Sequence, residues 1–530
     1  MKISQLFHWL RKLYDSNVVI AIATIFSATA VLAYAYPRWL HISDFDGIAN
    51  LNVARFLTHS FTPGFSQIGV WNLLNHMLLA PAVAVDFWYT TGVAGFIVHV
   101  PSLFLTAYCI NRLCMEVTDD VYASLVAALI FIFNPYVLIF TVSPMSEPVF
   151  FLLLAASAMY FAQWVRRDLM EKLLLSAACI ALSSVARFEA FALVPMGVFA
   201  VILTGLHRKY SWSRLSSEVL LFGLIACLGS VFVVFYSWFY TGNPLYFISY
   251  SAVRDTADVT VHTMQMISDG WWNAERVHSF LPTLYEALRL QFSLLILVVA
   301  ATGMTWLAVR RQRWTFLMTI IVLLAPTLFV AASYVTGKRY IGVPPFYPQY
   351  VNIRYVLHVG VALSLFCSCS IAVLRSSGYH FVRRAGFGLG IVSLVASIFF
   401  SAHEFYLGSF QALRNNVAYA GNLSGATSLS EVYDFGNVLI SHGDNETFIF
   451  ESHIPLERIV YESNYLYYMQ AIREPWLFVR WVVLNMNDGI ARDQISRVFF
   501  YHVNKDVFSQ YYELVMEDGG RKIYRVRESV

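Results

Sequence analysis

The chain has 530 residues, of which 58% are hydrophobic and 13% are charged, and its formal net charge is +3. A soluble globular domain carries roughly twice this share of charged residues, so the composition excludes an ordinary soluble protein. No block of basic residues is present, and we expect no nucleic-acid partner. The six cysteines show neither the spacing of a metal site nor that of a disulfide framework.

Apolar runs recur along the chain, with lengths close to the ~20 residues that cross the hydrocarbon core of a bilayer. They predict an α-helical polytopic membrane protein with eleven spans, which are 18–36, 91–111, 121–140, 147–165, 173–186, 190–206, 218–240, 289–309, 315–335, 356–374 and 386–402. One further apolar stretch, 66–89, is interrupted by Asn, His, Pro and Asp residues. We interpret it as an interfacial or re-entrant helix rather than a span.

Lysine and arginine set the predicted orientation. The N-terminal segment 1–17 and the inter-span segments on its side together carry twice as many of these residues as the opposite inter-span segments, although they are shorter in total. The positive-inside rule therefore places the N-terminus in the cytoplasm and the C-terminus outside a plasma (inner) membrane. One inner segment, 112–120, is net acidic and departs from this pattern.

Two domains follow from the distribution of the spans. Residues 1–402 are predicted to form the transmembrane domain, with a first outer loop at 37–90 and a long outer loop at 241–288. Residues 403–530 are mixed in pattern and predict a small extracytoplasmic α/β domain.

Local patterns within the C-terminal domain indicate strands and a hairpin. Glu446–Glu451 and Trp481–Leu484 combine aromatic and β-branched residues, which predicts two strands. The last segment turns at Gly519-Gly520 between two alternating runs, which predicts a β-hairpin.

Two carboxylates, Asp44 and Asp46, follow the first span with one residue between them. The next residues, 47–56, are compatible with a helix, and the acids would then lie at its N-terminal end, where the helix dipole favours an anion. Three apolar residues would share one broad side that Asn52 interrupts: Ile48, Leu51 and Phe56. This side predicts a helix lying on the membrane surface, and the alternative for the two acids is a solvated loop.

The carboxylate pair resembles that of the C-type glycosyltransferase superfamily, whose members are polytopic enzymes that use polyprenyl-phosphate sugars. Protein O-mannosyltransferases, GPI mannosyltransferases and the lipid A aminoarabinose transferase are examples. In this family an acidic pair opens the first extracytoplasmic loop about nine residues before Ala-Arg. Here Asp44-x-Asp46 precedes Ala54-Arg55 in the same way.

Other segments share the resemblance. Trp71–Pro81 is similar to the helix that follows in family members, and Phe133–Tyr136 with Ser143–Pro148 is similar to the outer turn between the third and fourth spans. A soluble C-terminal α/β domain is also common in the family. The resemblance implies inverting transfer of a sugar from a polyprenyl-phosphate donor to a glycan, lipid or protein acceptor. The reaction would take place at the outer face of the membrane, and the membrane lipids would surround the protein.

The resemblance assigns Asp44 and Asp46 to the catalytic site. A positioned carboxylate can remove the proton of an attacking hydroxyl as general base. The sequence establishes no cofactor, but if a divalent ion such as Mg²⁺ or Mn²⁺ is used, the same two acids are its predicted ligands.

The departing phosphate needs positive charge, and outer-side residues are candidates for it. The predicted substrate- and phosphate-binding residues are Arg187, Lys338, Arg339, Arg354, Glu147, His76, Glu189 and Arg55. For the charged residues the alternative is pairing or anchoring at the membrane interface. For Glu147 it is a helix N-terminal carboxylate, and for His76 a histidine with a purely structural role.

Two rival functions are open. A lipid-linked polysaccharide polymerase or ligase has a similar number of spans, but lacks an acidic pair directly after the first span. A transporter tends to show paired repeats and charges near the bilayer midplane, whereas the charges here gather between the spans.

Overall fold

The computed structural model describes residues 3–42, 45–69, 73–244, 274–304, 313–336, 341, 343, 352–407, 429–442, 445–487, 490–491, 495–496, 505–518 and 520–527. Contacts between residues divide the chain into two compact units whose sequences interleave. The first, here the membrane unit, comprises Met1–Arg38 and Phe96–Asn415. The second, here the sheet unit, comprises Trp39–Gly95 and Asn416–Val530.

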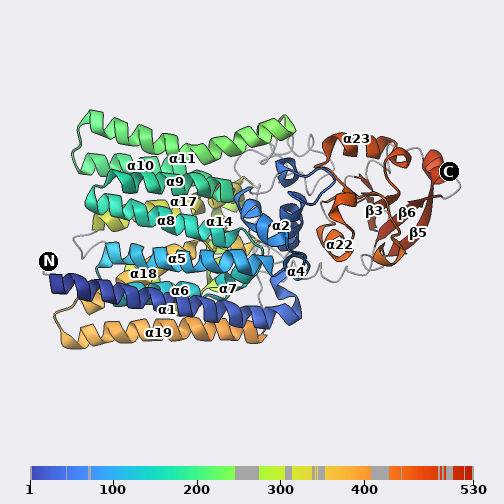
Figure 1. Ribbon diagram of the computed structural model, residues 1–530. Coiled ribbons are helices and arrows are strands. Elements are labelled where there is room, and N and C mark those ends of the chain that lie inside the picture. The colour runs from blue at the N-terminus through green and yellow to red at the C-terminus, as the bar shows by residue number, and fades with distance from the viewer. Residues whose placement is uncertain are drawn as a thin grey trace. The chain divides into compact units, whose positions relative to one another are not determined.

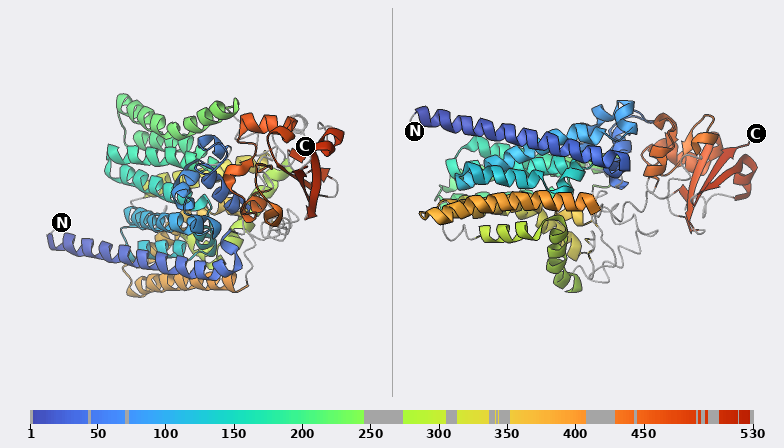
Figure 2. Two further views of the ribbon diagram at one scale, coloured as in Figure 1. Left: turned by 45° about the vertical axis from the view of Figure 1, so that its right-hand side comes forward. Right: turned by 90° about the horizontal axis from the view of Figure 1, so that it is seen from below.

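Long apolar helices make up the membrane unit, and most of them run roughly parallel or antiparallel to one another (Figures 1 and 2). They are α1 (Ile3–Ala35), α5 (Ala94–Thr118), α6 (Val121–Ile132), α7 (Pro135–Val142), α8 (Glu147–Arg167), α9 (Met170–Ala186), α10 (Leu193–His207), α11 (Trp212–Thr241), α14 (Ala274–Gln291), α15 (Leu294–Gly303), α17 (Arg313–Val335), α18 (Val359–Arg375) and α19 (His380–Leu407). Each of the eleven predicted spans overlaps one of these helices or a bent pair of them.

Length and composition qualify seven helices of the described residues as membrane spans, or nine if each of two bent pairs is one span. The two remaining predicted spans correspond to α9 and α18, which have 17 residues each. The prediction of an α-helical polytopic membrane protein is therefore confirmed, and the chain is an integral membrane protein. Within 66–89 the helix α3 (Leu73–Val83) has 11 residues, or roughly 17 Å, about half of what a span requires.

The bend between α6 and α7 follows from the local sequence. Pro135 has no N–H to continue α6, and it is well suited to the first turn of α7. The side chain of Asn134 caps that turn by accepting hydrogen bonds from the main-chain N–H groups of Tyr136 and Val137. The two helices consequently meet at 60°, and α14 and α15 meet at 118° (Figure 2).

Segment 112–120 is the acidic exception to the positive-inside pattern. Its acidic residues pair with arginines of neighbouring segments at the same end of the helices. Arg166 contacts Asp119 at 2.8 Å and Glu116 at 3.5 Å, and Arg167 also pairs with Glu116. Asp120 pairs in the same way with Arg375 of α18 (3.0 Å). The net acidic character of this segment is thus balanced locally by the basic residues that surround it.

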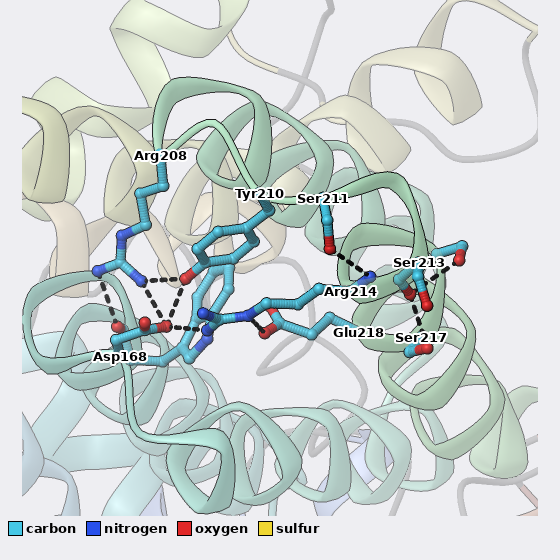
Figure 3. Close-up of polar contacts among 10 residues, drawn as sticks. Asp168, Arg208, Tyr210, Ser211, Ser213, Arg214, Ser217 and Glu218 are labelled. Atoms are coloured by element: carbon cyan, nitrogen blue, oxygen red, sulfur yellow. Dashed lines mark hydrogen bonds and ion pairs between the residues drawn. The ribbon is translucent and has the colours of Figure 1, made fainter.

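A second network at this end joins the segment after α8 to the segment between α10 and α11 (Figure 3). The carboxylate of Asp168 accepts hydrogen bonds from Arg208 (2.8 Å), Arg214 (2.5 Å) and the Tyr210 hydroxyl. Arg214 also pairs with Glu218 at 2.8 Å, and its guanidinium lies 3.7 Å from the centre of the Tyr210 ring. Burial opposes ionisation of Asp168, but the hydrogen bonds from Tyr210 and Arg214 outweigh it and lower the pKa of this carboxyl.

The sheet unit is built around a mixed β-sheet. Its strands are β1 (Val438–Leu439), β2 (Ile459–Val460), β3 (Trp481–Asn487), β4 (Ile490–Ala491), β5 (Tyr512–Asp518) and β6 (Arg521–Val526). The order is β2-β1-β3-β6-β5, with β4 paired to β3. Strands β1, β2 and β3 are parallel, whereas β3, β6 and β5 are antiparallel neighbours. The predicted C-terminal α/β domain and its final hairpin are confirmed.

The sheet unit also contains short helices from both ends of the sequence. The first outer loop supplies η2 (Leu40–Ile42), α2 (Phe45–Phe56), η3 (Phe65–Ile68), α3 and α4 (Asp86–Thr90). The C-terminal part supplies α22 (Glu446–Glu451), η7 (Leu456–Arg458), α23 (Tyr465–Arg473), η8 (Pro475–Leu477) and α25 (Lys505–Tyr511).

The helix predicted after the carboxylate pair is present as α2, but the predicted position on the membrane surface is wrong. Ile48, Leu51 and Phe56 are buried, and so are Asn52 and Val53, which break the predicted stripe. The helix packs against α3 and α22 within the sheet unit (Figure 1). Long-range packing therefore buries nearly all sides of a helix whose sequence indicated one apolar side.

The strand predicted at Glu446–Glu451 is also wrong, because this segment forms α22. Its apolar residues Phe448, Ile449 and Phe450 are all buried, which a short helix in a packed interior allows as readily as a central strand. Contact with α2 supplies the tertiary environment that overrides the β propensity of the segment.

Gly229 tests how closely two membrane helices must approach. A Cβ atom at this position of α11 would lie 1.8 Å from the main-chain oxygen of Ala181 in α9. Since helices in membranes associate closely through small residues, we expect Gly229→Ala to destabilise the protein by about 1–3 kcal/mol. Thermal unfolding in detergent measures the effect.

The matched control is Gly223→Ala on the same helix, where the new Cβ would lie 3.6 Å from a Val198 methyl group, an ordinary contact. We expect this variant to keep or slightly raise the unfolding temperature, because alanine is the better helix former. Equal unfolding temperatures for the two variants would contradict the close approach of α9 and α11.

Candidate functional site

Four of the predicted site residues converge in the membrane unit, where they form a buried charge cluster of Glu147, Arg187, Glu189 and Arg354. They come from three segments that are far apart in the sequence. Glu147 and Glu189 are each 2% exposed, Arg354 is 5% exposed and Arg187 is 7% exposed. Two positive and two negative side chains therefore neutralise one another out of contact with water.

Local structure explains how each side chain reaches the cluster. Glu147 is the first residue of α8, and Pro148 occupies the first turn, where its missing N–H costs no hydrogen bond. The helix dipole favours the Glu147 carboxylate at this end. Arg187 ends α9 in an extended conformation (φ −155°), and Glu189 follows in the short 3₁₀ helix η4 (Phe188–Ala192). Arg354 lies in η5 (Ile353–Val356), with two residues between the end of η5 and the start of α18.

Arg187 is the central residue of the cluster, because each of its three side-chain nitrogens has a partner. Nε and Nη2 bind the two carboxylate oxygens of Glu189 at 3.2 and 3.0 Å. Nη1 lies 2.7 Å from Oε1 of Glu147 and donates to the Ser146 hydroxyl at 3.0 Å. Burial alone would lower the pKa of Arg187, but the two carboxylates outweigh it and raise this pKa.

Within the cluster, Arg354 lies farther from Glu147 than Arg187 does. Its Nε lies 3.8 Å from Oε1 of Glu147, beyond hydrogen-bond distance. The guanidinium groups of Arg187 and Arg354 both lie 5.7 Å from the centre of the Tyr355 ring, within the range of cation–π attraction. The two arginines are thus held around one aromatic ring with a shared carboxylate between them.

One oxygen of the cluster is suited to an incoming group. Among the described residues, Oε2 of Glu147 is buried and has no hydrogen-bond partner. Buried polar atoms are nearly always paired in folded proteins, so such an atom requires a specific explanation. A hydroxyl group or a cation that reaches this point would supply the missing interaction.

The other described candidates belong to the sheet unit. Asp46 lies in the first turn of α2 and is partly exposed, while His76 of α3 is 1% exposed. Arg55, in the last turn of α2, pairs with Asp86 of α4 and donates to the main-chain oxygen of Val83. These contacts give Arg55 a structural task within the sheet unit, and its role toward a substrate stays a prediction.

Asp44, Lys338 and Arg339 lie outside the described residues. Within the residues that the structure describes, no three His, Cys, Asp or Glu side chains converge as metal ligands. The divalent ion therefore stays a prediction, and no catalytic step is derived through it.

Two residues at these sites were not predicted to have a role. His358, directly before α18, binds the Thr327 hydroxyl (3.0 Å) and the Tyr355 main-chain oxygen (2.9 Å), and nothing in its sequence context indicated a role. Asn52 is fully buried in α2. Its signal was visible as a polar residue within an apolar stripe, but the partners that give it meaning are distant in the sequence.

Comparison with known proteins gives structural likeness alone. No protein-family model matches the chain, and no curated protein matches its sequence. Among solved structures, the chain is similar to the archaeal oligosaccharyltransferase AglB from Archaeoglobus fulgidus in complex with an inhibitory peptide and a dolichol-phosphate. The identity is 10%, the TM-score is 0.49, and the match covers 98% of this chain and 74% of that one.

Two further solved structures are similar. ArnT from Cupriavidus metallidurans in the apo state has 11% identity and a TM-score of 0.48, with 95% of this chain and 98% of that one covered. The Archaeoglobus fulgidus oligosaccharyltransferase tethered to an acceptor peptide with the NVT sequon has 10% identity and a TM-score of 0.45. That match covers 89% of this chain and 69% of the other.

The pairing of Arg187 is expected to be essential for stability. Arg187→Gln leaves two buried carboxylates without their main counter-charge, and we expect it to destabilise the protein by about 3–5 kcal/mol. The double variant Arg187→Gln/Glu189→Gln removes one of these charges and should recover part of the loss. The measurement is thermal unfolding of the full chain in detergent.

Arg289→Gln is the control, because Arg289 is half exposed and pairs with Glu286 on the same helix. An exposed pair of this kind contributes at most about 1 kcal/mol. If Arg187→Gln lowered the unfolding temperature no more than Arg289→Gln, the cluster would not be a buried, mutually neutralised set of charges.

Proposed function

We propose that this integral membrane protein is a glycosyltransferase that moves a sugar from a polyprenyl-phosphate donor to an acceptor on the extracytoplasmic face. The observation that carries this proposal is the buried charge cluster of Glu147, Arg187, Glu189 and Arg354. Arg354, which lies beyond hydrogen-bond distance of Glu147, is a fixed positive charge in this buried setting and would favour the charge that develops on a departing phosphate. The resemblance of the Asp44-x-Asp46 segment to the C-type glycosyltransferases supplies the class of reaction.

The distribution of charge along the helices supports an outward-facing site. Glu147 begins α8 and Arg354 precedes α18, whereas Arg166, Arg167 and Arg375 lie at the opposite ends of the same two helices. Under the positive-inside rule the helix ends that are richer in lysine and arginine face the cytoplasm. On this basis we propose that the charge cluster lies on the extracytoplasmic side of the plasma (inner) membrane.

In the proposed reaction, the acceptor hydroxyl gives its proton to Asp46 and its oxygen attacks the anomeric carbon of the donor sugar. The bond between that carbon and the phosphate oxygen breaks, and the lipid phosphate leaves with the bonding electrons. Attack from the face opposite the leaving group inverts the anomeric configuration. Asp44 is the partner of Asp46, and the division of labour between the two acids is part of the proposal.

The remaining residues would act on charge and position. Arg354, together with Lys338 and Arg339, is proposed to stabilise the negative charge of the leaving phosphate. Arg187 holds Glu147 and Glu189 in place, since its own nitrogens are fully used. Oε2 of Glu147, which has no hydrogen-bond partner among the described residues, is suited to bind a hydroxyl group of donor or acceptor.

Isosteric replacement of the two acids tests the proposal. We expect Asp46→Asn and Asp44→Asn each to lower sugar transfer by a factor of about 10² to 10⁴, because an amide cannot act as a base. Membranes containing the full chain would be incubated with radiolabelled undecaprenyl-phosphate glucose, mannose and 4-amino-arabinose. Consumption of each donor, normalised to the amount of protein, gives the rate.

Glu474→Gln is the matched control, because it neutralises an exposed carboxylate elsewhere in the sheet unit. This variant should keep the wild-type rate. Full activity of both Asp→Asn variants would refute the assignment of the acids, whereas a wild type that consumes none of the donors would favour a polymerase, a ligase or a transporter.

A further inference from the structure

The parallel strands of the sheet unit present their carboxyl ends at one edge, where open α/β sheets commonly bind ligands. Ser441 and His442 follow β1, and Tyr461 and Glu462 follow β2. Strand β6 begins at the same edge, because Arg521 pairs with Asn485 near the end of β3. Polar side chains from three strands thus gather at this carboxyl edge.

Segments of the first outer loop cover this carboxyl edge. The Tyr461 hydroxyl donates to Gln67 at 2.5 Å, and the Asn464 side chain donates to the Thr62 hydroxyl at 2.7 Å. Phe56, the last residue of α2, stacks on Tyr461 with 4.6 Å between ring centres and meets the His442 ring edge-on at 5.7 Å. The edge therefore seats the end of α2 and the residues that follow it.

Asn52 fastens the middle of α2 to the helix that follows β1. Its Nδ2 donates to the main-chain oxygen of Glu446, the first residue of α22, at 2.9 Å. Its Oδ1 accepts a hydrogen bond of 2.7 Å from the Tyr89 hydroxyl of α4. Asn52 is 0% exposed, so both ends of its amide are used inside the fold. This arrangement explains the polar residue within an otherwise apolar helix.

We propose that Asn52 is a positioning residue, which sets the place of Asp46 by locking α2 between α4 and α22; this inference rests on the proposed function of Asp46. Asp46 precedes Asn52 by six residues on the same helix, or about 9 Å along its axis. A helix is stiff over this length, so a shift at Asn52 moves the carboxylate at the first turn. Asp46 touches the substrate in the proposed reaction, whereas Asn52 acts through the helix.

Two substitutions each remove one of the two hydrogen bonds of Asn52, which are here called the lock. Tyr89→Phe removes one hydroxyl and leaves Oδ1 of Asn52 buried without its donor, while Asn52→Asp replaces the donor toward Glu446 by an oxygen of similar shape. Tyr512→Phe is the matched control, because the Tyr512 hydroxyl is also buried in the sheet unit but donates to the main-chain oxygen of Val479. A merely structural hydrogen bond would give the three variants similar properties.

Hydrogen exchange of the full chain in detergent measures directly how firmly the two hydrogen bonds of Asn52 hold α2. For Tyr89→Phe and Asn52→Asp, we expect amides of residues 45–56 to exchange roughly tenfold faster than in the wild type, as loss of a buried hydrogen bond predicts. Tyr512→Phe should leave this segment unchanged. Unchanged exchange at 45–56 in both lock variants overturns the proposal.

Kinetics with the undecaprenyl-phosphate sugar that the wild type consumes fastest provides the second readout. We expect kcat to fall on the order of 10- to 100-fold in both lock variants with KM for the donor nearly constant, because a small misplacement of a reacting group lowers the rate more than binding. Equal kcat for Tyr89→Phe and Tyr512→Phe overturns the positioning role. If the wild type consumes none of the three donors, the proposed function fails, and the exchange data alone still decide whether Asn52 holds α2.

Discussion

Buried charge must be neutralised where water cannot reach it, and Arg187 meets this requirement for two carboxylates at once. Its planar guanidinium binds Glu189 through two nitrogens and Glu147 through the third. The three residues come from the end of α9, from η4 and from the start of α8, so the pairing fixes how these segments meet. An isolated carboxylate in such a buried position would be too costly to keep ionised, and Arg187 offsets this cost for both Glu147 and Glu189.

Charged residues are also paired at the opposite end of the helices, but these pairs are more exposed. There the acids of segment 112–120 lie against Arg166, Arg167 and Arg375, and Asp168 gathers Arg208 and Arg214. The pairs at this end are partly open to solvent, where each contributes little to stability. Their arrangement still explains why an acidic segment is compatible with an otherwise basic face.

In the sheet unit, the carboxyl edge of the parallel strands binds a segment of the chain itself. The carboxyl edge of parallel strands, a common place for small ligands, seats the first outer loop through Phe56, Thr62 and Gln67. The helix that carries Asp46 is in this way packed against the C-terminal part of the chain. For the reaction proposed above, such packing would supply the rigidity that precise positioning of Asp46 requires.

The sequence by itself determined the helical membrane architecture and the final hairpin, because a run of apolar residues and a turn at adjacent glycines are local properties. The sequence of residues 47–56 also predicts the helix α2, and Arg187, which lies between two predicted spans, and Glu147, at the outer turn where a predicted span begins, are candidates from the sequence alone. Only the tertiary structure decided that Glu446–Glu451 is helical, that α2 is buried and that Glu147, Arg187 and Arg354 meet. The contact of Asn52 with Glu446 joins residues 394 positions apart. Such pairings depend on the packing of whole segments against one another, and neither propensity nor periodicity within a segment contains that information.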